Sequence, residues 1–281
     1  MKSIGIITFH CVENYGAFLQ TYASIQIIKG IKNTNVSVIN YRPSFLTAQA
    51  KINFMAWTSK NNSLIYNLKK VLLYSITVPN RIQRKIRFCF AQKKYLVSGK
   101  PFHNRCEYCG PGYDYLYLGS DQIWNPEITD GLDPVYFGDL PNCETAVKFS
   151  YAASFGGASY SNKEIDIAQS YLRQLRYIGV RERSGENFVR EILARDSHTV
   201  LDPVLLVNPQ IWFDKTKKRL RKERYILVYQ LRQNPTLFTQ AIKFAQQHNL
   251  RIIHFGDPML RQKNIKSVSS AGPFEFVNYI R

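Results

Sequence analysis

The sequence predicts an α/β protein whose sheets consist of parallel strands. Short apolar runs, typical of buried strands, alternate with stretches whose apolar residues recur at helical spacing. The same alternation resumes after a long basic segment. A further series of strands and helices then begins near residue 225. These three observations together favour this fold class.

The chain opens with a strand, a helix and a second strand. Residues 4–8 form an apolar run, and residues 17–29 place their apolar side chains on roughly one helical face. Gly30 is the expected C-cap of this helix, and residues 36–40 alternate as the next strand. This order is a common opening of a parallel sheet.

A basic, helical insertion follows at about residues 45–100. Residues 64–76 have helical spacing, and we expect Pro79 to end that helix because proline lacks an amide hydrogen and clashes with the preceding turn. Residues 81–96 are expected to form a second helix, which carries several basic side chains. It fits an ordinary solvent-exposed helix or a helix that contacts anionic lipid headgroups.

The alternation then resumes and continues to about residue 205. The expected strands are residues 115–118, 147–152, 177–180 and 198–201, and the expected helices are residues 163–175 and 184–194. We therefore assign residues 1–205 to one Rossmann-like domain that carries the basic insertion.

A second domain is expected after a basic connector. Residues 225–230 and 251–255 are strand-like, residues 235–248 are helical, and Gly272 and Pro273 open another helix. Residues 206–281 are therefore expected to form part of a second Rossmann-like domain.

The composition is that of an ordinary globular protein. Of 281 residues, 45% are hydrophobic and 21% are charged, which excludes collagen-like, mucin-like and wholly disordered chains. No apolar run approaches the roughly 18 residues of a membrane-spanning helix. The N-terminus is typical of a strand rather than of a signal peptide, so we expect a cytoplasmic protein.

The charge is strongly positive and unevenly distributed. The formal net charge is +18, and residues 14–106 hold fifteen basic and no acidic residues. Such a field attracts acidic glycans, anionic lipids or a multiply charged small substrate, although a solvated basic surface gives the same pattern. We expect no nucleic-acid partner because no recognised nucleic-acid-binding motif is present.

The five cysteines do not predict a disulfide framework or a metal site. Cys106 and Cys109 form a single C-x-x-C motif, with His103 nearby as an alternative third ligand. No second pair completes a zinc site, so we expect reduced thiols and no metal.

Polar residues gather where the expected strands end, which is where ligands bind in open parallel sheets. Asp121, His10 and Asp202 are the candidates for acid–base catalysis. The candidate substrate-binding residues are Arg181, Asn14, Gly16, Gly119, Ser120, Gln122, Trp124, Ser154 and Gly156.

Glycine and tryptophan have specific expected roles at these strand ends. Gly119 and Gly156 lack a Cβ, so their backbone N–H groups can approach an anion. Trp124 stacks on a sugar, anchors a loop or packs in the core. Neither the dinucleotide fingerprint nor the P-loop motif occurs in the chain.

A set of short motifs covers most of the chain. They are GIITFH (5–10), NYGAFLQ (14–20), VINYRP (38–43), LGSDQIWN (118–125), SYAASFG (150–156), VRERS (180–184), VLDPVLL (200–206) and GPFEF (272–276). In this combination the chain resembles the polysaccharide pyruvyl transferase family.

The resemblance implies two Rossmann-like domains that face each other across a cleft, as in GT-B glycosyltransferases. It implies phosphoenolpyruvate as the donor and ketal-linked pyruvate on two hydroxyls of a glycan sugar as the product. Family members bind the donor through arginines or lysines, and Arg181 matches the arginine of the family's V-R-x-x-S element. They also use a histidine that lies beyond the GPFEF element. The sequence ends at Arg281, so we expect an incomplete second domain.

Our first functional hypothesis is therefore a pyruvyl transferase that modifies a cell-surface polysaccharide precursor, such as a capsule or exopolysaccharide precursor. The implied partners are phosphoenolpyruvate and a glycan or lipid-linked oligosaccharide, with no cofactor. A peripheral contact with the anionic inner face of the membrane is a further expectation. The alternatives are a non-catalytic module that binds an anionic glycan or membrane surface, and a sugar-nucleotide glycosyltransferase of GT-B architecture.

Overall fold

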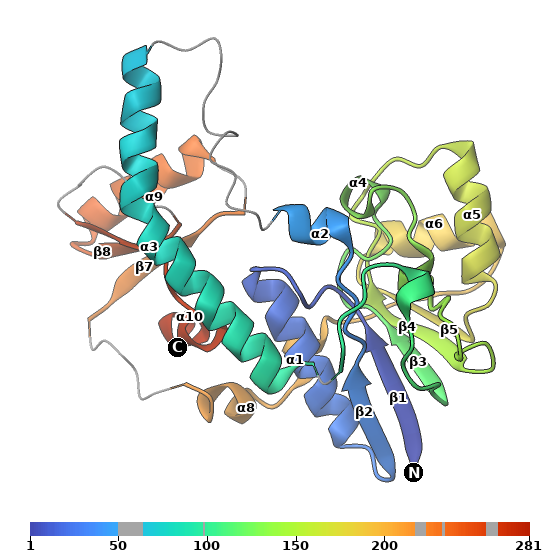
Figure 1. Ribbon diagram of the computed structural model, residues 1–281. Coiled ribbons are helices and arrows are strands. Elements are labelled where there is room, and N and C mark those ends of the chain that lie inside the picture. The colour runs from blue at the N-terminus through green and yellow to red at the C-terminus, as the bar shows by residue number, and fades with distance from the viewer. Residues whose placement is uncertain (50–63, 98, 217–222, 232–233, 257–263) are drawn as a thin grey trace. The chain divides into compact units, whose positions relative to one another are not determined.

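The computed structural model describes residues 1–49, 64–97, 99–216, 223–231, 234–256 and 264–281 (Figure 1). The chain divides into two compact units. Unit 1 comprises Met1–Lys51 and Ala91–Val207, and unit 2 comprises Ile52–Phe90 and Asn208–Arg281. The domain boundary expected after residue 205 stays a prediction, as does the GT-B arrangement.

Unit 1 contains a sheet of six parallel strands in the order β2-β1-β3-β4-β5-β6. The strands are β1 (Lys2–Ile7), β2 (Thr34–Val38), β3 (Tyr115–Leu118), β4 (Val147–Ala153), β5 (Tyr177–Val180) and β6 (His198–Thr199). This sheet confirms the predicted α/β class with parallel strands.

The strands of unit 1 end at a common edge. Ile7 is the register partner of Leu118, Ala153 is the partner of Val180, and Val180 is the partner of Thr199. A register shift in β4 between Ser150 and Ala153 brings its last residue back into line with β5. The residues that follow these strands therefore all lie at the carboxyl edge of the sheet.

Helices cover both faces of this sheet. The helices of unit 1 include α1 (Tyr15–Lys29), α2 (Ser44–Gln49), α4 (Pro126–Thr129), α5 (Asn162–Leu172), α6 (Arg183–Leu193) and α7 (Pro203–Leu206), with 3-10 turns η2 (Arg105–Glu107) and η3 (Pro134–Phe137). The chain moves from β1 to β2 in one direction across the sheet and from β4 to β6 in the other. Right-handed crossovers therefore place α1 on the face opposite to α5 and α6 (Figure 1).

Helix α1 begins and ends at residues that the sequence marks. The Asn14 side chain accepts a hydrogen bond of 3.2 Å from the backbone N–H of Ala17, which satisfies one of the free donors at the helix start. Gly30 is the C-cap, as predicted, and its N–H donates to the carbonyl of Gln26. Most of the helix is buried, which explains its largely apolar sequence.

Unit 2 contains a three-stranded parallel sheet in the order β7-β8-β9. Its elements are α8 (Pro209–Phe213), β7 (Tyr225–Tyr229), α9 (Pro235–Gln247), β8 (Arg251–Phe255), β9 (Ile265–Val268) and α10 (Pro273–Ile280). Strand β9 was not predicted, because its four residues include Lys266 and Ser267 and form no clear apolar run. The start of α10 is fixed by Glu275, which accepts a 2.8 Å hydrogen bond from the Gly272 N–H and lies 2.5 Å from the Arg87 guanidinium.

Helix α3 (Leu64–Tyr95) is continuous, so the prediction that Pro79 separates two helices is wrong. A proline removes one backbone donor and strains the preceding turn, which normally kinks or ends a helix. Here the helix continues on both sides, and the Pro79 side chain is exposed. Among the described residues, no helix combines the length and apolarity needed to cross a bilayer.

We predict that Pro79→Ala stabilises the protein, because alanine restores the missing donor and removes the clash. Helix propensities differ by about 3 kcal/mol between the two residues, of which roughly 1–3 kcal/mol should appear after the added entropy of the unfolded chain is subtracted. Thermal unfolding followed by circular dichroism measures the change. Gln83→Ala, at an exposed position of the same helix, should change the melting temperature much less. A lower melting temperature for Pro79→Ala would contradict this expectation.

Candidate functional site

The strand order of unit 1 creates a switch point between β1 and β3. From β1 the chain continues to β2 on one side, whereas from β3 it continues to β4, β5 and β6 on the other. In open α/β sheets, ligands bind beyond the carboxyl ends of the strands at such a point. All the predicted site residues belong to unit 1 and follow the strands at this edge or lie at the start of α1.

A buried glutamine connects the turns that follow β1 and β3. Gln20 donates through Nε2 to Thr8 Oγ1 at 2.9 Å and to the Phe9 carbonyl at 3.3 Å. Its Oε1 accepts a 3.3 Å hydrogen bond from the N–H of Ser120. Gln20 therefore fixes the two sides of the switch point relative to each other. Gln20 was not among the predicted site residues, although an amide in a largely apolar helix is a signal that could have identified it.

Gly119 needs glycine for two reasons. Its φ of +114° lies in a region that other residues rarely adopt. A Cβ at this position would lie 2.6 Å from the Tyr151 carbonyl oxygen, which belongs to β4. The turn after β3 can therefore pass close to β4 only because residue 119 has no side chain.

Three predicted residues from three different strand ends meet beyond this turn. The Ser120 hydroxyl donates to Asp202 Oδ2 at 3.0 Å. Arg181 Nη1 donates to the Ser120 carbonyl at 3.3 Å and lies 3.6 Å from the same Asp202 oxygen. The Arg181 side chain is 30% exposed. Asp202 also caps α7, since its Oδ1 accepts from the N–H of Val204 at 3.0 Å.

Asp121 lies beside this group and has an unusual titration. Burial raises the pKa of its carboxyl to about 6, although a hydrogen bond from the Gln122 N–H and the nearby Arg181 charge act in the opposite direction. The negative charge of Asp202 adds to the increase. A carboxyl group with this pKa can both accept and release a proton near neutral pH.

Glu182, which was not among the predicted site residues, accepts hydrogen bonds from the turn after β4. Glu182 Oε1 accepts hydrogen bonds from the Ser154 hydroxyl at 2.6 Å, the Phe155 N–H at 3.2 Å and the Gly156 N–H at 3.4 Å. Its Oε2 lies 3.7 Å from Arg181 Nε. The predicted anion-binding groups of Ser154 and Gly156 thus contact a carboxylate of the protein itself.

Gln122 and Gly156 pack tightly against each other. Gln122 Oε1 accepts a 2.9 Å hydrogen bond from Asn125 Nδ2, and a Cβ at Gly156 would lie 2.3 Å from the same oxygen. At the start of α1, a Cβ at Gly16 would lie 3.2 Å from Asn14 Oδ1. In this structure Asn14 and Gln122 make intramolecular contacts that shape the turns.

Trp124 lies in the core, and the expectation that it stacks on a sugar is not supported. The residue is 0% exposed, its indole donates to the Tyr136 carbonyl at 3.1 Å, and its ring stacks on Phe137 with centroids 5.5 Å apart. A fully buried ring has no free face for a ligand. The contacts of Trp124 fit the other two expected roles, which are packing in the core and anchoring a loop.

His10 is also buried, with 1% exposure. Nδ1 lies 3.1 Å from the Thr8 carbonyl, and Nε2 lies 3.3 Å from Asn40 Oδ1. Burial lowers the pKa of His10 to about 4, so the ring is neutral at physiological pH. In this arrangement His10 supports the turn after β1, and its predicted catalytic role stays a prediction.

The C-x-x-C motif forms no metal centre in the described part of the chain. Cys106 and Cys109 are exposed free thiols, and His103 Nδ1 lies 2.8 Å from the Arg42 carbonyl. No three His, Cys, Asp or Glu side chains gather as metal ligands within the described residues.

A comparison with family models agrees with the motifs at these strand ends. The model of the family described as polysaccharide pyruvyl transferase matches residues 14–281, nearly the whole chain. The chain belongs to the polysaccharide pyruvyl transferase family. The matched region includes every predicted site residue except His10. No curated protein matches the chain at a significant level.

The charge at the candidate site contrasts with that of the whole protein. Arg181 is the one predicted site residue with a permanent positive charge, and it lies beside the carboxylates of Asp202 and Glu182. Asp121 adds a third acidic group. The strand ends of β3, β5 and β6 are therefore locally acidic, within a chain whose net charge is +18.

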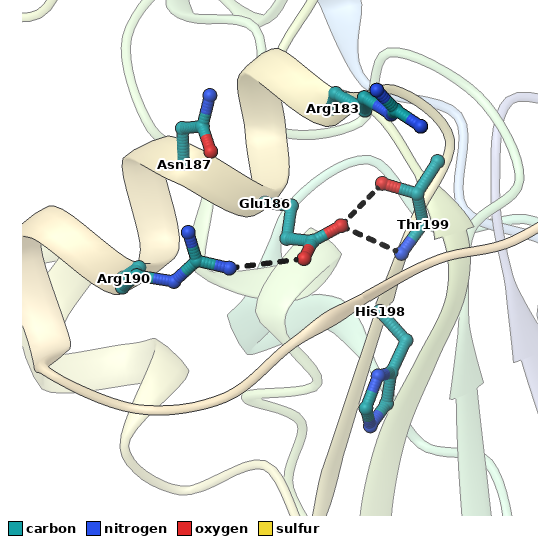
Figure 2. Close-up of a pocket in the computed structure, with 6 residues that line it drawn as sticks. All are labelled: Arg183, Glu186, Asn187, Arg190, His198 and Thr199. Carbon is teal, nitrogen blue, oxygen red and sulfur yellow. Dashed lines mark hydrogen bonds and ion pairs between the residues drawn. The ribbon is translucent and has the colours of Figure 1, made fainter.

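A separate pocket of about 470 Å³ lies on α6 and β6 (Figure 2). It is lined by Arg183, Glu186, Asn187, Arg190, His198 and Thr199. Glu186 accepts from the Thr199 N–H at 3.2 Å, from the Thr199 hydroxyl at 2.6 Å and from Arg190 Nη2 at 3.1 Å. None of the predicted site residues lines this pocket, whose central carboxylate joins α6 to β6.

We predict that Gly119→Ala is more destabilising than Gly131→Ala. Both glycines have positive φ, so both substitutions cost about 1–2 kcal/mol of backbone strain. Only at Gly119 would the new Cβ meet backbone atoms, whereas nothing lies within 4 Å of the corresponding position at Gly131. We expect a further loss of about 1–3 kcal/mol for Gly119→Ala in urea unfolding. Equal losses would show that the β3 turn is not constrained by β4.

We predict that Asp121→Asn has a pH-dependent effect on stability. The folded-state pKa of about 6 lies above the unfolded value, so ionisation of Asp121 opposes folding as the pH rises from about 4 to 6. Asparagine cannot ionise and keeps an oxygen for the Gln122 N–H. The melting temperature of the variant minus that of the native protein should therefore increase as the pH rises through this window. Above about pH 7 this difference should be constant. A difference that does not change with pH would contradict the raised pKa.

Proposed function

We propose that this polysaccharide pyruvyl transferase moves the pyruvyl unit of phosphoenolpyruvate onto two hydroxyls of one sugar in a cell-surface polysaccharide precursor. The observation that carries the proposal is the convergence of Arg181, Ser120 and Asp202 beside Asp121, at the carboxyl edge of the unit 1 sheet. This edge combines a planar cation with a carboxyl group that titrates near neutral pH.

The proposed reaction consumes one donor and two sugar hydroxyls. A proton is added to the methylene carbon of phosphoenolpyruvate, which becomes a methyl group and leaves positive charge on the central carbon. One sugar oxygen bonds to that carbon, and the carbon–oxygen bond to phosphate breaks. The second sugar oxygen then closes the ketal ring. The two hydroxyl protons balance the proton taken up by carbon and the proton left with phosphate or solvent.

The residues at the strand ends suit different parts of this reaction. The Arg181 guanidinium can bind the carboxylate or phosphate of the donor with paired hydrogen bonds. Asp121, with a pKa of about 6, is the best candidate for the group that exchanges a proton. Asp202 is held by Ser120 and Val204, which suits it to position Arg181.

The donor carries more negative charge than Arg181 alone can balance. Asp202 and Glu182 already offset the arginine in this structure. Further cations are therefore required, and the basic residues of the chain are their natural source. The second-domain histidine of the family, the facing cleft and a contact with an anionic membrane stay predictions.

The activity is tested by incubating the full-length protein with phosphoenolpyruvate and candidate lipid-linked or soluble oligosaccharides. Phosphate release together with the mass gain of a pyruvate ketal would support the proposal. Donor binding without turnover on any plausible acceptor would favour the non-catalytic module. Stabilisation by sugar nucleotides and not by phosphoenolpyruvate would favour a glycosyltransferase.

We predict that Arg181→Lys weakens phosphoenolpyruvate binding by about 10- to 100-fold. A charge-assisted hydrogen bond contributes roughly 1.5–3 kcal/mol, and a lysine ammonium cannot reproduce the paired contacts of a guanidinium. Calorimetric titration measures the affinity, and the melting temperature reports on the fold.

The matched control is Arg183→Lys, which lies two residues further along and is exposed. It should leave donor affinity unchanged. Equal affinities for the native protein and Arg181→Lys, at equal melting temperatures, would remove Arg181 from the donor site.

A further inference from the structure

Three donors in the turn after β4 converge on one point. The Ser154 hydroxyl and the N–H groups of Phe155 and Gly156 all donate to Glu182 Oε1, at 2.6, 3.2 and 3.4 Å. The Gly156 N–H is shared, since it also donates to Ser154 Oγ at 3.0 Å. We call these three donors the carboxylate seat. Consecutive N–H groups that point into one concavity are a common way in which proteins bind anions.

The carboxylate seat is held in place without Glu182. Ser154 is 1% exposed, and its N–H donates to the Asp121 carbonyl at 3.0 Å. Its own carbonyl accepts a 3.3 Å hydrogen bond from the Trp124 N–H. The buried turn after β3 therefore supports the seat, so the seat does not need Glu182 to keep its shape.

Among the described residues, the Glu182 side chain bonds only to the seat donors and to Arg181. Glu182 is the N-cap residue of α6, yet its side chain makes no capping hydrogen bond, so the helix start does not depend on it. Its side chain is 30% exposed, and Gly156 of the seat is exposed as well. The Glu182 side chain therefore reaches the seat from the solvent side.

Arg181 lies next to the carboxylate seat. Its Nε is 3.7 Å from Glu182 Oε2, so an anion in the seat also faces the guanidinium. A donor approaching Arg181 would meet the negative charge of Glu182 as long as that side chain remains there. A donor whose carboxylate replaced that of Glu182 would instead gain the three seat donors and the arginine.

We infer that the carboxylate seat binds the carboxylate of the donor, and that Glu182 occupies the seat until the donor displaces it. This inference rests on the proposed function, since it takes phosphoenolpyruvate as the donor. Glu182 is then an internal competitor that neutralises Arg181 in the empty enzyme. The apparent donor affinity is then the affinity of the open seat multiplied by the fraction of time for which the seat is open.

Glu182→Ala tests the inference because it removes the competitor and leaves the seat. We expect phosphoenolpyruvate to bind about tenfold more tightly, the factor that applies if the seat is open for about a tenth of the time. Pyruvate, a carboxylate without the phosphate, should show a gain in the same direction. Ser154→Ala in the Glu182→Ala background should reverse the gain, because it removes one seat donor. If the alanine variant fails to fold, Glu182→Gln is measured in its place. Glutamine keeps the shape of the side chain and removes its charge, so we expect a smaller gain in donor affinity.

Glu186→Ala is the matched control, since Glu186 lies one turn further along α6 and accepts from Thr199 and Arg190. It removes the same charge and should leave donor affinity unchanged. An equal gain in this control would show a general charge effect and overturn the inference. Unchanged or weaker binding in folded Glu182→Ala would also overturn it, because Glu182 would then hold Arg181 in place rather than compete with the donor.

The outcome for the proposed function can be distinguished from the outcome for the seat. If phosphoenolpyruvate binds neither the native protein nor any variant, the proposed function fails. The pyruvate titration then decides the seat alone: tighter pyruvate binding in Glu182→Ala supports a carboxylate site, and no gain overturns it.

Discussion

The buried polar groups that follow the strands of unit 1 must form hydrogen bonds within the protein, because an unpaired buried polar group lowers the free energy of unfolding. The buried amide of Gln20 satisfies groups on both sides of the switch point, and Ser120 satisfies Asp202 and Arg181. These bonds join segments that are far apart in the chain. The site therefore consists of one connected network, in which the position of each charged group depends on a neutral neighbour.

The acidic character of this network restricts which ligands the site can bind. A single arginine between two carboxylates is well oriented but nearly neutralised. Such a site favours an anionic ligand only if the ligand replaces an acidic side chain or if further cations approach. The strand ends of unit 1 thus orient Arg181. The net positive charge that an anionic ligand needs must come from elsewhere.

Much of the fold could be predicted because the strong patterns are local. The strands Tyr115–Leu118, Tyr177–Val180 and Arg251–Phe255 have the predicted bounds, since each contains a short stretch of large apolar residues. Strand β9 lacked such a run. Helix α3 continues through Pro79, although the local rule for proline predicts a break there.

The site could be predicted only in part. The rule that parallel strands present their carboxyl ends together located Ser120, Asp121, Arg181 and Asp202 in one region. Gln20 and Glu182 were missed because their partners lie 100 and 28 residues away, and no local pattern reveals such pairs. Trp124 could not be assigned to the core or to a ligand until its neighbours were known.

The carboxylate of Glu186 also affects the outer edge of the sheet. Strand β6 is the last in the order, and an edge strand offers unpaired N–H groups to which another chain can add a strand. The Thr199 N–H is already bonded to Glu186, and the strand is two residues long. A second molecule would find one donor occupied and a negative charge in the path of its carbonyl groups. The same side chain that joins a helix to this strand therefore protects the sheet against edge-to-edge aggregation.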